Sequence, residues 1–328
     1  MEETNNSQTK ENTKIKHVKK RLKQNKKPIC GIYAFLNGFF AVKFLNNSSV
    51  KNLCDLNKKF KNISVEDINN VVSDMWYEAV AETDVKNLDE KENHEVRSLD
   101  AEKIKYSLIG EFFSSTKLSK FIECEKVFNI LNKNEYSNLL KDIVSGKEKI
   151  VTEEIKYDKN LANEVKDSKN SFYIIPINSV NNMHWICLIY FEKENTYCIL
   201  NSAGDCWGEI TAKKQYKVRN GQCGYCCRGI NNLDELKKVW KDIQTNKKDY
   251  AFEFGKWSNK AKPMKLYNEF IERRLREEED EENVKKLKKL KKRGEVIPKS
   301  NLIFDYNKSK FNIVKVTIEE KEDDKQLV

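Results

Sequence analysis

The chain contains one segment that is apolar on nearly every side. From Ile32 to Leu45, eleven of fourteen residues are apolar or aromatic, and the exceptions are Asn37, Gly38 and Lys43. A helix that is apolar all round is a buried helix. We therefore predict a buried helix here, with ordered structure beginning at residue 28.

Two further regions carry apolar residues at helical spacing. Ser64 is a suitable N-cap, two acidic residues follow it, and apolar positions recur every three or four residues from Ile68 to Val80. Residues 101–144 show the same periodicity, whereas residues 83–100 form a charged break. These patterns predict that the first half of the chain is helical.

After about residue 170 the apolar positions become typical of strands. Three short runs, 172–177, 185–191 and 196–200, are rich in aromatic and β-branched residues. The polar tetrad 192–195 separates the second run from the third. We predict that these two runs form a hairpin within a sheet.

Both ends of the chain are highly charged. Residues 10–27 hold nine lysines and arginines against one glutamate, which gives +8 of the total net charge of +10. From about Leu266 an acidic block precedes a basic block, which suits the dipole of a long helix. We expect a disordered basic arm over 1–27, a folded domain over 28–255 and a charged helical extension over 256–328.

Composition restricts the class of protein. Only 39% of the 328 residues are hydrophobic, and no apolar run approaches the roughly 18 residues of a membrane-spanning helix. The first residues lack the apolar stretch of a signal peptide. We expect a cytoplasmic protein without a membrane partner, in which the nine cysteines are thiols.

Candidate chemistry centres on a thiol and an imidazole. Of the three histidines, His17 and His94 lie in charged segments, and only His184 begins an apolar strand. Asn201 ends the next strand, where the hairpin brings its amide against the imidazole. Cys30 begins the buried helix, whose dipole favours a thiolate, and Gln24 precedes it by six residues, where its amide can donate to an oxyanion.

These residues, in this order, resemble the papain-like cysteine peptidases. The matching runs are Gln24, Cys30-Gly-Ile-Tyr-Ala-Phe35, Met183-His184-Trp185, Leu200-Asn201-Ser202 and Trp207-Gly-Glu209. The resemblance implies that Cys30 is the nucleophile, His184 the base, Asn201 its orienting partner and Gln24 part of the oxyanion hole. It also implies an α+β, papain-like fold in which a helical half carrying the nucleophile helix packs on an antiparallel sheet half.

A second resemblance uses the same histidine. His184-Trp185, Asn201, Gln215 and Cys223 are similar in order to the ubiquitin-like-protein deconjugating cysteine proteases, and this implies that Cys223 is the nucleophile. Cys223 and Cys226, with Cys227 beside them, also have the spacing of half a zinc site or of a redox pair. A non-catalytic interaction protein, with Cys30 as a packing residue, is the third hypothesis.

The hypothesis that best unites these features is a cysteine peptidase or amidase with a Cys30-His184-Asn201 triad. It acts on a peptide or isopeptide bond in a protein or peptide substrate, and it needs no cofactor and no metal. We expect no nucleic-acid partner, although residues 10–27 have the charge to contact anionic surfaces.

Overall fold

The structure of the protein is a computed structural model. It describes residues 14–23, 30–81, 115–132, 148–158, 160–179, 182–202, 230–245, 252–253, 303–304 and 312–320, together with 272, 275–276, 279–282, 284–285 and 287–288.

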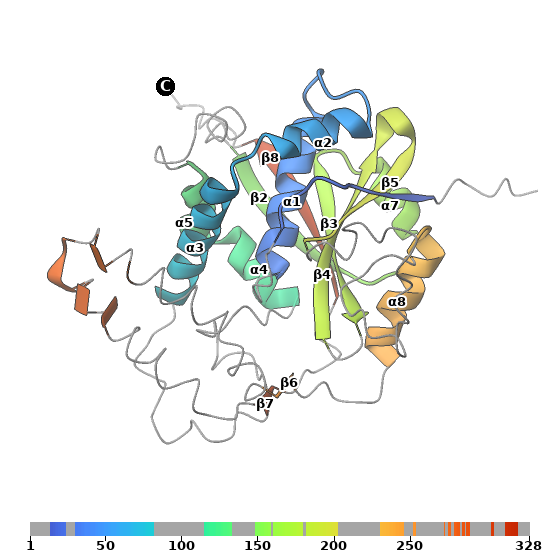
Figure 1. Ribbon diagram of the computed structural model, residues 1–328. Helices are drawn as coiled ribbons and strands as arrows, with labels where there is room; N and C mark the ends of the chain where they lie inside the picture. The colour runs from blue at the N-terminus through green and yellow to red at the C-terminus, as the bar shows by residue number, and fades with distance from the viewer. Residues whose placement is uncertain are drawn as a thin grey trace, which may run out of the picture.

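A six-stranded mixed sheet forms the centre of the molecule (Figure 1). Its strands are β1 (Ile15–His17), β2 (Glu148–Ile155), β3 (Ser171–Ser179), β4 (Asn182–Phe191), β5 (Thr196–Leu200) and β8 (Ile313–Glu320). Their order is β1-β5-β4-β3-β8-β2, with β1 parallel to β5 and the other neighbours antiparallel. A second, two-stranded sheet consists of β6 (Phe252–Glu253) and β7 (Ile303–Phe304).

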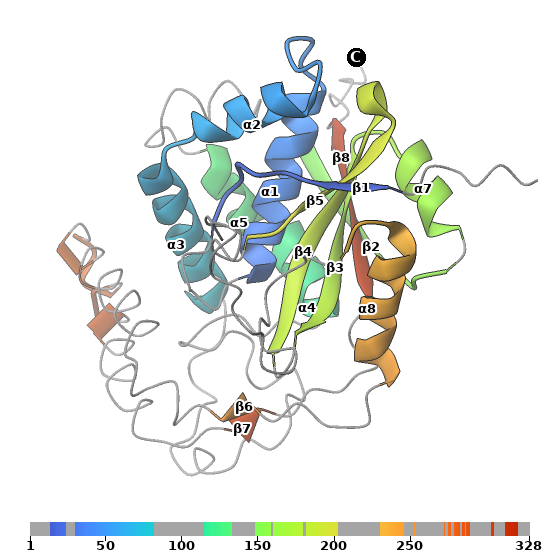
Figure 2. The same ribbon diagram turned by 45° about the vertical axis from the view of Figure 1, so that its right-hand side comes forward.

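Helices cover both faces of the larger sheet, as Figures 1 and 2 show. One face carries α1 (Cys30–Leu45), α3 (Val65–Ala81), α4 (Ser115–Glu123), α5 (Glu125–Asn129) and the 3-10 helix η3 (Ile130–Asn132), with α2 (Leu53–Lys61) beside the end of α1. The other face carries α7 (Leu161–Asp167) and α8 (Leu233–Thr245). The buried residues form a first core around α1 and a second core beneath α7 and α8.

Alternate side chains along the strands contribute to the two different cores. In β4, Trp185 and Cys187 belong to the first core, whereas Ile186 and Leu188 belong to the second. Successive side chains of a strand point to opposite faces, so a strand that is covered on both sides has to be apolar at every position. This explains why the run from residue 185 to residue 191 is continuously apolar instead of alternating with polar residues.

Helix α1 lies between the sheet and the outer helices. Thirteen of its sixteen residues are buried, which agrees with its apolar sequence. At Gly38 the helix approaches β3 so closely that an added Cβ would lie 2.0 Å from Cδ2 of Phe172. The position therefore requires glycine because of the close contact between helix and strand.

Several sequence-based predictions are confirmed. Helix α1 spans the predicted buried helix, and the Ser64 side chain accepts a hydrogen bond from the Asp67 backbone at the start of α3. Strands β4 and β5 form the predicted hairpin through a short turn, in which Asn195 has a φ of 45°. The fold class is α+β, as expected.

The prediction of a disordered arm over 1–27 is wrong for residues 14–23. Ile15 and Val18 are buried, and β1 pairs in parallel with β5, so ordered structure begins before residue 28 and the sheet is mixed, not purely antiparallel. The physical reason is that the apolar residues between the lysines face the core, while the lysines remain at the surface. Residues 24–27 lie outside the described residues.

The prediction of a helical extension over 256–328 is wrong for residues 303–304, which form β7, and for residues 313–320. Residues 313–320 form β8, which lies between β3 and β2 inside the sheet. Their alternating apolar positions Val314, Val316 and Ile318 complete the first core. The folded domain therefore includes this distant segment, while the described residues at 281–282, 284–285 and 287–288 are helical, as predicted.

Besides β1 and β8, the described elements α2, α7, α8, β2, β6 and β7 were not predicted from the sequence. The helical prediction for 101–144 is confirmed at α4 and α5, and its remaining residues, 101–114 and 133–144, lie outside the described residues.

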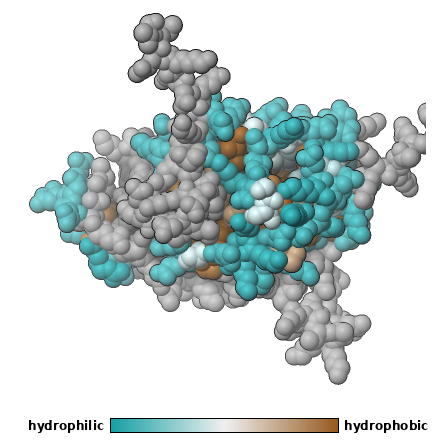
Figure 3. Space-filling model, turned by 90° about the horizontal axis from the view of Figure 1, so that it is seen from above, coloured by the Kyte–Doolittle hydropathy of each residue, from teal (hydrophilic) through white to brown (hydrophobic). Residues whose placement is uncertain are grey.

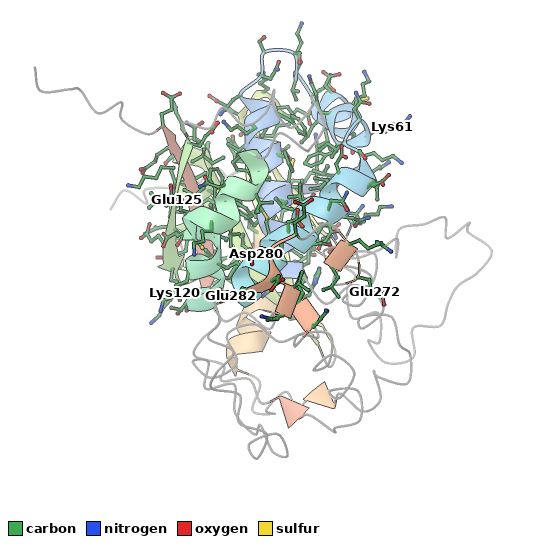
Figure 4. All side chains as sticks on the ribbon, turned by 90° about the vertical axis from the view of Figure 1, so that its left-hand side faces the viewer. Lys61, Lys120, Glu125, Glu272, Asp280 and Glu282 are labelled. Carbon is green, nitrogen blue, oxygen red and sulfur yellow. The ribbon has the colours of Figure 1, made fainter. Side chains whose placement is uncertain are left out.

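The outer surface of the helical layer is charged. Figure 4 shows exposed charged side chains on this side of the molecule, namely Lys61, Lys120, Glu125, Glu272, Asp280 and Glu282. The end of the molecule above α2 is likewise mainly hydrophilic where it is described (Figure 3). Within the described residues, no helix has the length and apolar character needed to span a bilayer.

We predict that Gly38→Ala lowers the free energy of unfolding by about 2 kcal/mol, because a methyl group there overpacks the contact with Phe172. Urea denaturation of the two proteins measures the difference. Adding Phe172→Leu to the alanine variant removes the ring and should restore part of the loss. An alanine variant as stable as the parent protein would contradict the proposed close contact.

Candidate active site

The buried imidazole of His184 is the centre of the candidate site. His184 is the third residue of β4, pairs with Ile177 of β3 and is 0% exposed. His17 lies in β1, where its Nε2 is 2.9 Å from the carbonyl oxygen of Ile230. His94 lies outside the described residues. Of the two described histidines, His184 is the one that contacts another candidate residue.

The β4–β5 hairpin brings Asn201 to this imidazole. The pairing of the two strands places Leu200 opposite Cys187, so Asn201 follows directly where β5 ends. Its Oδ1 lies 2.7 Å from His184 Nε2, and both residues are buried. An amide oxygen can only accept a hydrogen bond, so Nε2 carries the proton and Nδ1 is the basic nitrogen of the ring. Asn201 thus selects one tautomer of His184.

Burial keeps the imidazole neutral. Desolvation lowers the pKa of His184 from 6.5 to about 4, and the hydrogen bond to Asn201 opposes this shift. At neutral pH the ring is therefore uncharged and able to accept a proton. With Nε2 fixed as a donor, Nδ1 is the nitrogen through which the ring can accept a proton.

Cys30 lies at the same end of the sheet as His184. At the other end, Asn46 Nδ2 donates to Asn170 Oδ1 at 2.9 Å, which aligns the end of α1 with the start of β3. From this contact, the sixteen residues of α1 extend about 24 Å back to Cys30. The strand from Ser171 to Ile177 extends about 23 Å in the same direction. Because Ile177 pairs with His184, these two lengths place the start of α1 and His184 at the same end of the sheet.

The environment of Cys30 differs from that of the sheet cysteines. Cys30 is partly buried and packs against the first core. The first-turn N–H groups of a helix point toward its N-terminal end, where the dipole favours negative charge. By contrast, burial raises the pKa of Cys187 well above its usual value and that of Cys198 to about 12. These two thiols are packing residues.

The alternation of side chains along β4 limits how the Cys30 thiol and the His184 imidazole can approach each other. His184 lies on the same face of the strand as Ile186, which belongs to the second core, whereas Trp185 lies on the opposite face, toward α1. The pairing of β5 with β4 ends at Cys187, so the first residues of β4 extend past it. Any approach between a group on α1 and the His184 ring therefore takes place at the end of the sheet and not across its face.

Two residues that the sequence analysis did not assign to the site connect its parts. Arg21 is buried, and its Nε donates to the backbone carbonyl of Asn201. Asn37 of α1 is 0% exposed and bonds to both backbone groups of Leu22. The sequence signal for Asn37 was a lone amide in an otherwise apolar helix, whereas Arg21 had no distinguishing signal among the neighbouring lysines.

The remaining candidates lie outside the described residues. Gln24 follows directly after the described segment 14–23, and Gln215, Cys223, Cys226 and Cys227 all fall between 203 and 229. The oxyanion role of Gln24, the alternative nucleophile and the zinc hypothesis therefore stay predictions. Among the residues that the structure describes, no group of three or more histidine, cysteine or acidic side chains is arranged to hold a metal.

Comparisons with known proteins give no relative. No protein-family model, no curated protein and no solved structure matches the chain.

We predict that His184 makes stability depend on pH between about 4 and 6.5. Its pKa is 6.5 when unfolded and about 4 when folded, so the unfolded chain binds more protons in this range. The stability contributed by the neutral ring is complete above pH 6.5, and about 3 kcal/mol of it is lost as the pH falls toward 4.

The measurement is the difference in unfolding free energy between the parent protein and His184→Gln at several pH values. Subtracting the unfolding free energy of the variant removes the contributions of the carboxylates and of His17, whose pKa is also lowered by burial. The difference should shrink as the pH falls, and a constant difference would contradict the neutral, buried state of the ring.

Proposed function

We propose that the protein is a papain-like thiol hydrolase that cleaves a peptide or isopeptide bond. The observation that supports this most is the buried His184–Asn201 pair, with 2.7 Å between Nε2 and Oδ1, at the end of the sheet where the helix of Cys30 begins. A partly buried thiol at a helix start and a tautomer-fixed imidazole are the two groups that this chemistry needs.

In the proposed acylation step, Nδ1 of His184 accepts the proton of the Cys30 thiol. The thiolate attacks the carbonyl carbon of the scissile amide and forms a tetrahedral oxyanion. The backbone amide of Cys30 and, as the resemblance implies, the Gln24 side chain donate to this oxyanion. His184 then gives its proton to the leaving amine, the C–N bond breaks and a thioester to Cys30 remains.

In the proposed deacylation step, water attacks the thioester while His184 accepts one of its protons. Collapse of the second tetrahedral intermediate breaks the C–S bond. The carboxylic acid leaves, and the proton returns from His184 to the sulfur. Each proton passes through one ring nitrogen, so the step needs the tautomer that the Asn201 contact selects.

The proposed substrate is a protein or peptide, and the chemistry requires no cofactor. The five described cysteines are free thiols, which suits a reducing compartment, and we propose the cytoplasm as the place of action. The exposed lysines of the N-terminal segment, including Lys19 and Lys20, have the charge to contact anionic surfaces.

We predict that iodoacetamide at pH 7 alkylates Cys30 faster than Cys54. Cys54 is exposed and serves as the internal standard for an ordinary thiol. The labelled residues are identified by peptide mass analysis over time, and His184→Gln should slow labelling of Cys30 about tenfold without affecting Cys54. Preferential labelling of Cys223 would favour the deconjugase hypothesis, and equal labelling of all accessible thiols would favour a non-catalytic protein.

We also predict that Cys30→Ala and His184→Ala abolish hydrolysis of a generic acyl substrate, p-nitrophenyl acetate, with the fold retained. Asn201→Ala should reduce the rate about 10²-fold, part of what a positioned general base supplies. Cys54→Ala is the matched control and should leave the rate unchanged. Full activity of the Cys30→Ala protein would refute the assignment of the nucleophile.

A further inference from the structure

The N-terminal strap, defined here as residues 18–23, lies between the two parts of the candidate site. Its start continues the pairing of β1 with β5, since Val18 N donates to the carbonyl of Ile199 at 3.0 Å. Its middle contacts α2 through a 2.7 Å hydrogen bond from Lys20 N to Asn57 Oδ1. Figure 2 shows this segment crossing in front of α1 and beneath α2.

Leu22 attaches the strap to the helix of Cys30. The side chain of Asn37 accepts from Leu22 N at 2.8 Å and donates to Leu22 O at 3.0 Å. It also donates to Tyr33 O at 2.8 Å within α1. Asn37 is 0% exposed, so losing these bonds would leave buried backbone groups without partners. The attachment lies two helical turns from Cys30.

Arg21, the preceding residue, attaches the strap to Asn201. Its Nε donates to the backbone carbonyl of Asn201, and its Nη1 donates to Lys19 O at 2.9 Å. The guanidinium presents donors in a fixed plane, so two acceptors are held in a defined relative position. Asn201 thus receives support from outside the hairpin at the point where the pairing of β5 with β4 ends.

We propose that Arg21 is a positioning residue for the His184–Asn201 pair. By holding the main chain of Asn201, it holds the amide that selects the His184 tautomer. Through Leu22 and Asn37, it also connects this pair to the helix that carries Cys30. The consequence for catalysis rests on the proposed function, whereas the effect on the imidazole does not.

The imidazole provides a direct test that needs no substrate. The chain has three histidines, so ¹⁵N-histidine labelling gives a simple spectrum whose ring shifts report the tautomer of each. The variants are Arg21→Met, which keeps the length but removes the donors, and Arg21→Lys, which keeps the charge. Lys16→Met is the matched control, since Lys16 lies nearby and bonds to Glu194 instead of Asn201.

In Arg21→Met, the His184 ring signals should move toward those of Asn201→Ala, which lacks the contact. Iodoacetamide labelling of Cys30 should slow about tenfold, as expected for a small displacement of reacting groups. Arg21→Lys should show a smaller change in both measurements. Lys16→Met should keep the parent His184 signals and stay within about twofold in labelling rate.

An unchanged His184 spectrum in a folded Arg21→Met protein would overturn the proposal, and so would equal effects of Arg21→Met and Lys16→Met. If Arg21→Met does not fold, Arg21→Lys carries the same comparison.

Different measurements refute the proposed function and the proposed role of Arg21. A parent protein whose Cys30 reacts no faster than Cys54 would refute the thiol hydrolase, while the histidine spectrum would still decide the role of Arg21.

Discussion

The arrangement of the molecule depends on enclosing α1. A helix that is apolar on nearly every side is stable in water only when other elements cover every side of it. The sheet covers one side, the outer helices cover another, and the strap supplies Val18 and Leu22 to the same core. Enclosure also constrains Asn37, because a buried amide has to be hydrogen-bonded. The backbone of Leu22 meets that requirement, so the apolar helix and its one amide together determine where the strap lies.

Local patterns predicted those elements whose partners are close in the chain. The buried helix at α1, the cap at Ser64 and the β4–β5 hairpin all follow from residues a few positions apart. Strands β1 and β8 were missed because their partners are distant. The three residues of β1 pair with residues near position 198, and β8 lies between strands that begin at residues 148 and 171. Charge dominated both sequences, although the apolar positions of β8 already alternated.

The same distinction applies to the candidate site. The contact between His184 and Asn201 was predictable because a single hairpin creates it. The bonds of Arg21 and Asn37 were not, because their partners are backbone groups that tertiary packing brings near. A backbone carbonyl has no sequence signature, so an arginine or asparagine that hydrogen-bonds to one looks in the sequence like any other arginine or asparagine. Only Asn37 could be singled out, since an amide inside an apolar helix needs a buried partner.

The degree of burial distinguishes the cysteine thiols that pack within the sheet from the Cys30 thiol at the start of α1. Cys187 and Cys198 lie within the sheet, where burial raises their pKa and makes them inert as nucleophiles. Cys30 lies partly buried at a helix start, where negative charge is favoured. For His184, burial keeps the ring neutral at pH 7. A buried N–H requires a hydrogen-bond partner, and the Asn201 oxygen meets that need at Nε2. The same contact leaves Nδ1 as the basic nitrogen of the ring, and the Arg21 bond holds the main chain of Asn201 in place.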